Sequence, residues 1–375
     1  MKILQISNYI YPHIGGIEQV ARDCINAMKD HEQKLICFNS DKKTKIDKVD
    51  GVEVTRVGCQ FKIASQSIAF GYKKELEFIM HDFKPDVVIF HYPNPFVARY
   101  LLKILKHFPK CKLVLYWHLD ITKQKFLKMF FNGQNKRLIQ RACKIVATSP
   151  NYIEGSKYLS SVRDKCVVIP NCVSDEKTVT SEIAKTRCEE IRSSAKGKTI
   201  CFAYGRHVPY KGIEYLVRAS KLLDENYVIF IAGSGPLTDS LKKLASGDKK
   251  VIFLGKISND ELIAHILACD IFCFPSITKN EAFGIALAET MNYEKPCVTF
   301  NIPQSGVNYV SLDGVTGIEV ENRNVVAYAE AIMSLAESPE LRAKYGKNAK
   351  ERVQELFTFE KFKKNVQDFI SQLEG

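Results

Sequence analysis

The sequence predicts an α/β protein of two domains, each built on a parallel sheet that is covered by helices. Three observations lead to this prediction. The chain has 375 residues, whereas a single domain usually takes roughly 150. Short β-rich runs alternate with amphipathic stretches of helical period along nearly the whole chain, as they do in βαβ units. This alternation pauses once and then starts again, which divides the chain into two similar halves.

The first half begins with a run of apolar residues that we interpret as a strand. The run stops at Asn8 and no small-residue cleavage site follows it, so a signal peptide is disfavoured. Further β-rich runs follow at intervals that leave room for a helix. The expected strands of this half are residues 2–6, 33–38, 52–57, 86–90, 112–116, 144–148 and 166–169.

The second half follows a polar, charged stretch at 174–198, which we expect to be the linker. Residues 323–372 are expected to form consecutive helices, one opened by Ser338 and the next by Thr358. We therefore expect an N-terminal domain at 1–180 and a C-terminal domain at 181–375, with a last helix at about 357–373 that packs back on the N-terminal domain. The expected strands of the second half are residues 199–203, 227–232, 250–254, 270–274 and 296–300.

The composition indicates a globular protein of a reducing compartment. Hydrophobic residues make up 46% of the chain and charged residues 26%, which excludes a disordered chain. The chain has 12 cysteines but no C-x-x-C pair, so we expect buried thiols rather than disulfides or a metal site. The apolar runs fall short of the ~20 residues of a spanning helix. We expect a cytoplasmic protein, with peripheral attachment to the inner face of the plasma membrane as a further possibility.

The net charge of +12 indicates an anionic partner. Nucleic acid, acidic lipid headgroups and phosphorylated substrates all fit this charge. No helix-turn-helix, zinc-finger or RNP-type signature occurs, so we do not expect nucleic acid.

The loops that follow the strands are where chemistry is expected, because ligands of open α/β sheets bind at the carboxyl ends of the strands. The first such loop contains Gly15 and Gly16, just before the first helix. Paired glycines let the backbone approach an anion closely at a helix N-terminus. A plain strand-to-helix turn is the alternative interpretation.

A second loop follows the first strand of the second half and carries Arg206 and Lys211. Two cations in a glycine-punctuated loop can clasp a diphosphate, the arginine through its planar fork and the lysine as a point charge. The alternative is a pair of solvated surface cations.

The third motif is a pair of carboxylates, Glu281 and Glu289, separated by seven residues. Gly284 is expected to open a helix, so that Glu281 lies in the loop and Glu289 about one turn into the helix. Both carboxylates would then be available to accept hydrogen bonds from sugar hydroxyls. Ordinary surface glutamates are the alternative, but the rest of this segment is apolar and should be buried.

The ordered combination of these motifs, with Gly-Ser-Gly-Pro at 233–236, resembles the retaining family 4 of GT-B glycosyltransferases, the group 1 glycosyl transferases, over nearly the whole chain. Residues 117–121 (Trp-His-Leu-Asp-Ile), Gln124-Lys125 and 147–152 (Ala-Thr-Ser-Pro-Asn-Tyr) further resemble bacterial mannosyltransferases of O-antigen and other surface polysaccharides. The resemblance implies a GT-B fold, with two Rossmann-like domains facing across a cleft and C-terminal helices.

The resemblance also implies roles for the motif residues. Arg206 and Lys211 would bind the donor diphosphate, and Glu289 would hold the ribose hydroxyls. Glu281 would hold a hydroxyl of the transferred sugar, and His118 would face the same sugar from the other domain. The implied catalytic residues are thus His118, Glu281, Arg206 and Lys211, and the implied donor-binding residues are Gly15, Gly16, Arg206, Lys211, Phe283, Gly284, Ile285 and Glu289, with backbone N–H groups of Gly16, Gly284 and Ile285 assisting.

The implied activity is retaining transfer of a hexose, with mannose favoured, from a GDP-sugar or UDP-sugar to a growing, lipid-linked surface glycan. Two other functions stay open: a non-catalytic nucleotide-sugar-binding subunit of a transferase complex, and a nucleotide-sugar 2-epimerase on a similar fold. Residues 291–296 and 321–324 depart from the family pattern, which puts fine substrate specificity in doubt.

Two further expectations concern metal and membrane. No D-x-D pair is available to hold a metal, so we expect a metal-independent enzyme with no cofactor besides the donor substrate. The segment at 123–141 mixes apolar residues with Lys and Arg. It is either a helix that lies on an anionic membrane surface, where lipid-linked acceptors reside, or a helix that covers its domain with solvated cations.

Overall fold

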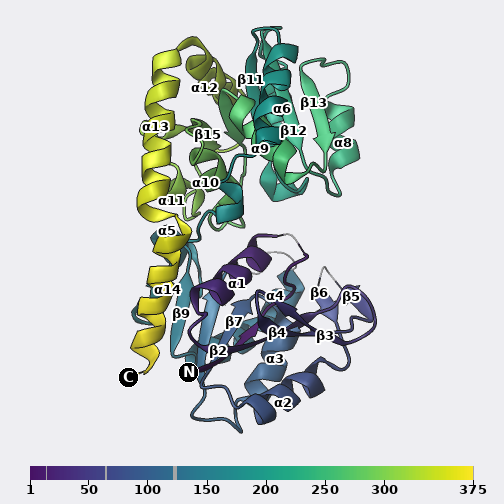
Figure 1. Ribbon diagram of the computed structural model, residues 1–375, viewed down its shortest axis with the longest axis vertical. Helices are drawn as coiled ribbons and strands as arrows, with labels where there is room; N and C mark the ends of the chain where they lie inside the picture. The colour runs from purple at the N-terminus through teal and green to yellow at the C-terminus, as the bar shows by residue number, and fades with distance from the viewer. Residues whose placement is uncertain (14, 64–65, 121–124, 375) are drawn as a thin grey trace. The chain divides into compact units, whose positions relative to one another are not determined.

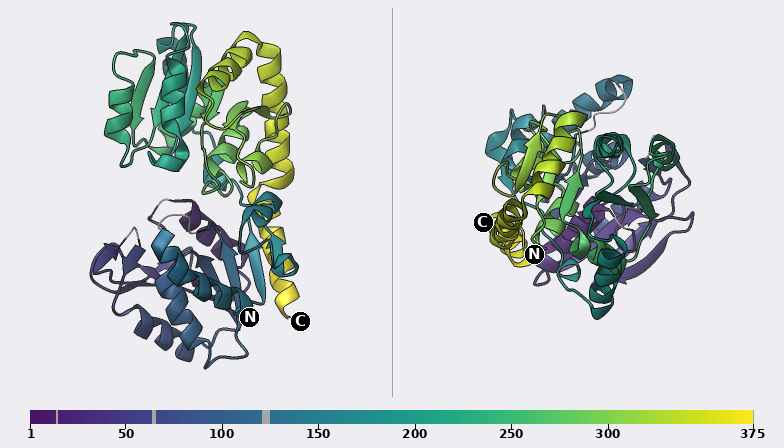
Figure 2. Two further views of the ribbon diagram at one scale, coloured as in Figure 1. Left: turned by 180° about the vertical axis from the view of Figure 1, so that it is seen from behind. Right: turned by 90° about the horizontal axis from the view of Figure 1, so that it is seen from above.

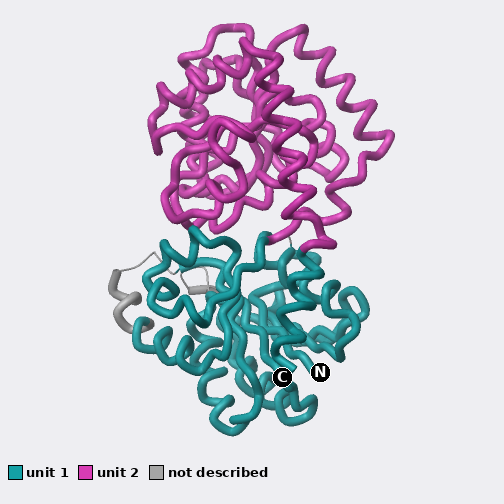
Figure 3. Tube along the Cα trace, turned by 90° about the vertical axis from the view of Figure 1, so that its left-hand side faces the viewer, with its two compact units in different colours: residues 1–170, 362–375 teal, residues 171–361 magenta. Residues whose placement is uncertain are grey.

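The computed structural model describes residues 1–13, 15–63, 66–120 and 125–374 (Figure 1). The chain forms two compact units, which Figure 3 shows in different colours. Unit 1 consists of residues 1–170 and 362–375, and unit 2 of residues 171–361. The expected domains at 1–180 and 181–375 stay a prediction.

Unit 1 contains an eight-stranded sheet in its described residues, in the order β10-β9-β8-β7-β1-β2-β4-β3. All neighbouring strands are parallel except the antiparallel pair of β3 and β4 at one edge. A short antiparallel hairpin, β5 (Phe61–Ile63) with β6 (Gln66–Ile68), stands apart from it. The strands of the sheet are β1 (Lys2–Ile6), β2 (Glu32–Phe38), β3 (Lys45–Val49), β4 (Val52–Val57), β7 (Val87–Tyr92), β8 (Lys112–Trp117), β9 (Lys144–Ala147) and β10 (Cys166–Val168).

Helices cover both faces of this sheet (Figures 1 and 2). Central strands therefore bury side chains on both faces, and every residue of β7 is buried. The helices of unit 1 are α1 (Gly16–Ala27), α2 (Tyr72–Phe83), α3 (Pro95–Ile104), α4 (Lys125–Arg141), α5 (Pro150–Gly155) and, from residue 362 onward, α14 (Phe359–Glu374), with a 3-10 turn at Arg163–Lys165.

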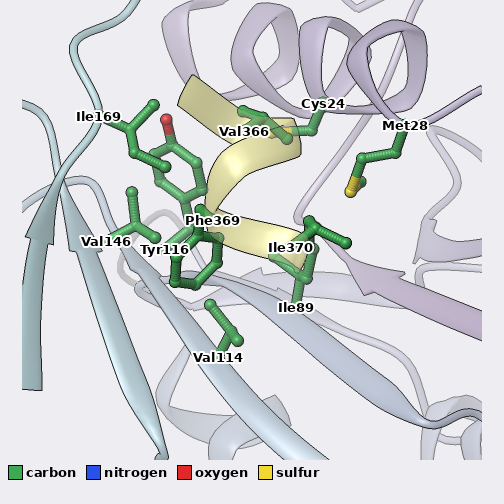
Figure 4. A pocket seen from close by; sticks show the side chains of 10 residues that line it. All are labelled: Cys24, Met28, Ile89, Val114, Tyr116, Val146, Ile169, Val366, Phe369 and Ile370. Atoms are coloured by element: carbon green, nitrogen blue, oxygen red, sulfur yellow. The ribbon is translucent and has the colours of Figure 1, made fainter. Parts of the chain in front are cut away.

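The C-terminal helix α14 packs against the unit 1 sheet through one apolar face. Val366, Phe369 and Ile370 point toward a small apolar pocket (Figure 4). The pocket is lined from the other side by α1 and by strands β7, β8 and β9. The Lys112 ammonium also donates a hydrogen bond to the carbonyl oxygen of Leu373 near the end of the helix. The chain's last helix is thus part of the hydrophobic core of unit 1.

Unit 2 contains a six-stranded parallel sheet, in the order β13-β12-β11-β14-β15-β16. Its core is rich in aromatic residues that are almost fully buried, including Phe202, Phe272, Phe300 and Tyr328. The strands are β11 (Thr199–Tyr204), β12 (Tyr227–Ala232), β13 (Val251–Gly255), β14 (Ile271–Phe274), β15 (Cys297–Phe300) and β16 (Gly317–Val320). The helices are α6 (Glu182–Ser194), α7 (Ile213–Ser220), α8 (Thr238–Leu244), α9 (Asn259–Ala268), α10 (Ile285–Met291), α11 (Val307–Val310), α12 (Val325–Glu337) and α13 (Pro339–Leu356), with 3-10 turns at Asp175–Lys177 and Pro209–Lys211.

The predicted fold class is confirmed, with two parallel α/β sheets and C-terminal helices. Each expected strand lies within two residues of an observed one. The strands β3, β5, β6 and β16 were not expected. The helices expected at 323–372 are α12, α13 and α14, and the oxygen of Ser338 accepts a hydrogen bond from the N–H of Leu341 at the start of α13.

The linker predicted at 174–198 is wrong. This stretch contains a 3-10 turn and then α6, a helix that packs against α9. The oxygen of Ser181 accepts a hydrogen bond from the N–H of Ala184 and so caps the helix. Only Ala184 and Ile191 are buried along α6, so one narrow apolar stripe holds a helix whose composition is otherwise that of a linker.

We predict that Phe369→Ala destabilises unit 1, because the phenyl ring fills the space between α14 and the sheet. The free energy of unfolding should fall by about 3–5 kcal/mol. The single tryptophan of the chain, Trp117, is buried in unit 1, so its fluorescence in a urea titration reports on this unit. Lys364→Ala, at an exposed position of the same helix, should change the midpoint little. Equal midpoints for the two variants would show that the helix contributes little.

Candidate functional site

The loops at the carboxyl ends of the unit 2 strands are held together at glycines. Gly212, after β11, has a φ of +60°, and a Cβ there would lie 2.1 Å from the carbonyl oxygen of Pro275, after β14. Gly233, after β12, has a φ of +111°, and its Cβ would lie 1.9 Å from the carbonyl oxygen of Gly205. Any larger residue would force these loops apart. The close approach brings the motif residues of different loops to one edge of the sheet.

Lys211 and Glu281 form an ion pair at this edge, with 2.5 Å between the lysine Nζ and the Oε2 of Glu281. The two side chains are only 14% and 11% exposed. The ammonium also lies 4.8 Å from the centre of the Phe274 ring. The hydroxyl of Ser276 donates to the same Oε2 at 3.2 Å, which fixes the carboxylate from a second side.

The lysine carries its charge at neutral pH. Burial by itself lowers the pKa of Lys211, but the adjacent carboxylate of Glu281 favours the ammonium form and leaves the pKa above the ordinary lysine value. Arg206 follows β11 on the same loop, and its side chain is exposed. Its charge acts on the ammonium of Lys211, which places the two cations near each other. Arg206 forms no ion pair with any residue that the structure describes.

Glu289 lies on α10, the short helix that begins after Gly284. The hydroxyl of Tyr204, the last residue of β11, donates to its Oε2 at 2.6 Å. Burial raises the pKa of Glu289, although the ammonium of Lys177, the hydrogen bond from Tyr204 and the charge of Lys211 oppose this shift. Glu289 is therefore within electrostatic reach of Lys211 and lies at the same edge of the sheet.

The start of α10 has the form expected from the sequence. Gly284 has a φ of +92°, a conformation that favours glycine, and its carbonyl oxygen accepts hydrogen bonds from the N–H groups of Leu287 and Ala288. The N–H groups of Ile285 and Ala286, the first two residues of the helix, have no intrahelical acceptor. The ring of Phe283 is buried against Phe357, with 5.2 Å between the ring centres. This side chain is therefore part of the hydrophobic core of unit 2.

Gly15 and Gly16 lie at the start of α1 in unit 1, as expected. Gly15 has extended backbone, so its φ does not require glycine. A Cβ at Gly15 would lie 2.3 Å from Oε2 of Glu18, but this atom is the end of a flexible side chain that can move aside, so space does not require glycine either. The carboxylate of Glu18 therefore lies directly over the beginning of the helix.

His118, the residue after β8, is 5% exposed and contacts a second histidine. Its Nε2 lies 3.0 Å from Nδ1 of His91 on β7. The Nε2 of His91 in turn lies 2.9 Å from Oε1 of Gln5 on β1. Burial lowers the pKa of His91 to about 3. Burial and the neighbouring His91 hold the pKa of His118 well below its ordinary value, so both rings are neutral.

The predicted site residues form two groups. Arg206, Lys211, Phe283, Gly284, Ile285 and the two glutamates belong to unit 2, whereas Gly15, Gly16 and His118 belong to unit 1. Sequence reasoning missed Tyr204 and Ser276, which hold the two glutamates, and also Gln5 and His91. A polar residue inside a strongly apolar strand was the available signal for Gln5 and His91.

Two further features of the described residues concern metal and membrane. No group of three or more His, Cys, Asp or Glu side chains there could hold a metal ion. Among the same residues, no helix combines the length and the apolar character that crossing a membrane requires.

Comparisons with known proteins agree with the architecture. The model of Glycosyltransferase Family 4 matches residues 14–177, and that of Glycosyl transferases group 1 matches residues 185–352. Among solved structures, sucrose-phosphate synthase from Thermosynechococcus elongatus has a TM-score of 0.82 at 18% identity, covering 99% of this chain and 98% of that one. Anabaena HepE in complex with UDP-glucose has a TM-score of 0.81 at 16% identity, covering 99% and 100%. These two likenesses show the fold.

Two curated relatives extend over almost the full length. The "O-antigen chain mannosyltransferase C" of Escherichia coli is 28% identical over 367 residues, which is 96% of this chain and 95% of the relative. The "D-rhamnosyltransferase WbpZ" of Pseudomonas aeruginosa is 30% identical over 363 residues, 96% of this chain and 92% of the relative. These matches favour a transferase over an epimerase or a non-catalytic subunit. The chain belongs to the family 4, group 1 glycosyltransferases and is a nucleotide-sugar glycosyltransferase.

Proposed function

We propose that the protein is a retaining hexosyltransferase that moves mannose or a related hexose from a nucleoside-diphosphate sugar to a growing surface glycan. The observation that carries this proposal is the charged, largely buried Lys211 beside the exposed Arg206 at the carboxyl edge of the unit 2 sheet. The names of the two full-length relatives, a mannosyltransferase and a rhamnosyltransferase, support a hexose.

Arg206 and Lys211 are proposed to take up the charge that develops on the leaving diphosphate. A preorganised cation stabilises such a charge most strongly where water is excluded, and Lys211 is held in place by Glu281 and Phe274 before any ligand arrives. Arg206 has no ion-pair partner among the described residues and is therefore available for a bidentate contact with phosphate oxygens. The backbone N–H groups of Gly16, Gly284 and Ile285, with Gly15 and Phe283 beside them, are proposed to assist.

Glu289 is proposed to hold the ribose hydroxyls, and Glu281 a hydroxyl of the transferred sugar. One oxygen of Glu281 already carries a lysine and a serine contact, which lowers the nucleophilicity of this carboxylate. Glu281 is therefore better suited to positioning the sugar than to forming a covalent intermediate. We propose attack on the same face that the diphosphate leaves, with a donor phosphate oxygen taking the proton of the acceptor. His118 is proposed to contact the transferred sugar.

The lipid-linked character of the acceptor is proposed from the basic segment at 123–141. Residues 121–124 lie outside the described residues, and α4 begins at Lys125. In the described part of this helix, Leu138 and Ile139 are buried, whereas Lys136 and Arg137 are exposed. The end of α4 thus covers its own unit and leaves cations outside, an arrangement that permits contact with an anionic membrane surface at the cytoplasmic face.

We predict that Arg206→Ala and Lys211→Ala each lower kcat/KM for donor turnover by about 10²–10³-fold, the usual cost of removing one group that stabilises developing charge. The donor would first be identified with a panel of UDP-, GDP- and dTDP-sugars, by hydrolysis and by protection from thermal unfolding. Arg218→Ala and Lys221→Ala, at exposed positions of the same unit, are the matched controls. Near-normal kcat/KM in both site variants would refute the diphosphate clasp.

Because Lys211→Ala leaves Glu281 without its partner, its loss of activity must be separated from a loss of stability. Thermal unfolding of each variant without donor makes this separation. Arg206→Ala breaks no ion pair among the described residues and should unfold like the parent protein.

We predict that turnover survives EDTA, because two cations are present where many transferases use a divalent metal. The measurement is donor hydrolysis by protein that has been dialysed against the chelator. Loss of turnover that Mg²⁺ or Mn²⁺ restores would show that a metal takes part.

We predict that neutralising the basic segment releases the protein from acidic lipid, since each cation near such a surface contributes ~1 kcal/mol. The test is cosedimentation with anionic liposomes, and donor hydrolysis should be unaffected. The substitutions to glutamine are at Lys123, Lys125, Lys128, Lys136 and Arg137. The control set, equal in charge and exposed elsewhere in unit 1, is Lys73, Lys74, Lys103, Lys106 and Lys110, also changed to glutamine. Cosedimentation that is equal in both sets would favour a helix whose cations are simply solvated.

A further inference from the structure

A row of hydrogen-bonded polar side chains crosses one face of the unit 1 sheet and ends at His118. Its members are Gln33 on β2, Gln5 on β1, His91 on β7 and His118 after β8. Neighbouring members are 3.2, 2.9 and 3.0 Å apart between the bonded atoms. We call these four residues the relay.

Strand register explains why the four side chains meet. Gln5 is paired with Leu35 on one side and with Ile89 on the other, and His91 is paired with Tyr116. Gln33 is two residues from Leu35, His91 is two residues from Ile89, and His118 is two residues from Tyr116. Because side chains two residues apart on a strand point to the same face, all four members of the relay lie on one face of the sheet. The same face carries Ile89, Val114 and Tyr116, which line the apolar pocket against α1 and α14 (Figure 4).

The hydrogen bonds of the relay have only one consistent direction. The amide nitrogen of Gln33 donates to the carbonyl oxygens of Ile25 and Met28 at the end of α1, which leaves its Oε1 as an acceptor. The amide nitrogen of Gln5 donates to that oxygen, so the Oε1 of Gln5 is the acceptor that faces His91. Two backbone carbonyls therefore orient both amides.

The two histidine tautomers follow from this direction. The Nε2 of His91 must carry a proton in order to donate to Gln5. Because His91 is neutral, its Nδ1 carries a lone pair and accepts the proton of Nε2 of His118. The Nδ1 of His118 is then unprotonated, and it has no hydrogen-bond partner among the described residues.

Burying the polar side chains of the relay costs free energy that a purely structural role would not require. Gln5 and His91 are fully buried, and apolar side chains at these positions would need no partners. His118 also stacks on Tyr116, with 4.8 Å between the ring centres, so the ring is held in orientation as well as in tautomer. The relay thus delivers one defined atom, Nδ1 of His118, as a lone-pair acceptor at the end of β8.

We propose that Gln5, Gln33 and His91 are positioning residues that hold His118 in its neutral Nε2–H tautomer, so that Nδ1 accepts a hydrogen bond from a hydroxyl of the transferred sugar. The inference rests on the proposed function, in which His118 contacts that sugar. A lone pair suits this place because the sugar becomes electron-poor in the transition state, when its hydroxyls are better donors. The opposite tautomer would point an N–H at the growing positive charge.

The tautomer can be measured without any donor. In protein labelled with ¹⁵N-histidine, the ring nitrogens of His118 report which one carries the proton, and a His118→Asn variant assigns its signals among the 8 histidines. We expect protonated Nε2 and bare Nδ1 in the parent protein. Gln33→Met frees the Gln5 amide to reverse, and Gln5→Met removes the acceptor of His91, so both should populate the Nδ1–H form of His118. A parent protein with His118 protonated at Nδ1 would overturn the relay.

The kinetic test uses the same variants and the donor that the panel identifies. Gln33→Met and Gln5→Met should lower kcat about 10-fold or more, in proportion to the Nδ1–H fraction, with KM nearly unchanged, because the lone pair acts mainly in the transition state. Val114→Ala, which removes packing from the same face of β8 but no hydrogen bond, should leave both the tautomer and kcat near the parent values. His118→Asn, whose amide oxygen can stand near the position of Nδ1, should retain more activity than His118→Ala.

The outcomes separate the two proposals. A tautomer shift in the glutamine variants without a fall in kcat beyond that of Val114→Ala would overturn the positioning role. Full activity of His118→Ala would refute the contact between His118 and the sugar, and with it the purpose of the relay. If the parent protein turned over no donor of the panel, the proposed function would fail, while the NMR result would still decide the tautomer.

Discussion

The ion pair between Lys211 and Glu281 is the interaction on which the proposed chemistry of unit 2 depends. A largely buried pair of this kind contributes little net stability, because desolvation of both charges offsets most of their attraction. The pair instead preorganises the site, because it fixes the position of the Lys211 ammonium before a ligand binds. The carboxylate keeps the ammonium of Lys211 charged and in place at the edge of the sheet.

The backbone makes this pair possible. Lys211 follows β11 and Glu281 follows β14, so the two loops must come together for the side chains to meet. Gly212 permits the approach, because its missing Cβ leaves room for the carbonyl oxygen of Pro275. The glycine next to the lysine in the sequence motif is thus a packing requirement of the site. The same holds for Gly233, which admits the backbone of Gly205.

Much of the fold could be predicted because buried parallel strands consist of continuous runs of mostly apolar residues, as in β7 and β12. The strands that were missed lack this signal. Strand β3 reads Lys-Ile-Asp-Lys-Val and lies at the edge of its sheet. Strand β16 reads Gly-Ile-Glu-Val, in which a charged residue interrupts the apolar run, and it also lies at a sheet edge. Helix α6 was taken for a linker because only two of its residues are buried.

More of the candidate site could be predicted from the sequence in unit 2 than in unit 1. The motif loops of unit 2 follow strands directly, so their cations and carboxylates could be assigned to one sheet edge from order alone. What the sequence does not contain is the pairing itself. Nothing in the spacing of Lys211 and Glu281 distinguishes an ion pair from two independent ligands, and nothing near Glu289 points to Tyr204. The relay is harder still, because its members are 86, 27 and 28 residues apart along the chain and meet only through strand register.

The two units place their polar groups at equivalent positions in the sheet, but the groups differ in charge. In each unit an apolar parallel sheet carries polar side chains at the carboxyl ends of central strands, β11 and β14 in unit 2, β7 and β8 in unit 1. Unit 2 presents positive charge, since Arg206 has no ion-pair partner among the described residues and Lys211 shares only one oxygen of Glu281. Unit 1 presents a neutral lone pair, because burial keeps both histidines of the relay uncharged. A sugar-diphosphate bond breaks into an anion and an electron-poor sugar, so a cation suits one product of that separation and a neutral acceptor suits the other. In the proposed mechanism a protonated His118 would place positive charge beside the electron-poor sugar, which gives a physical reason for burying it beside a second neutral ring.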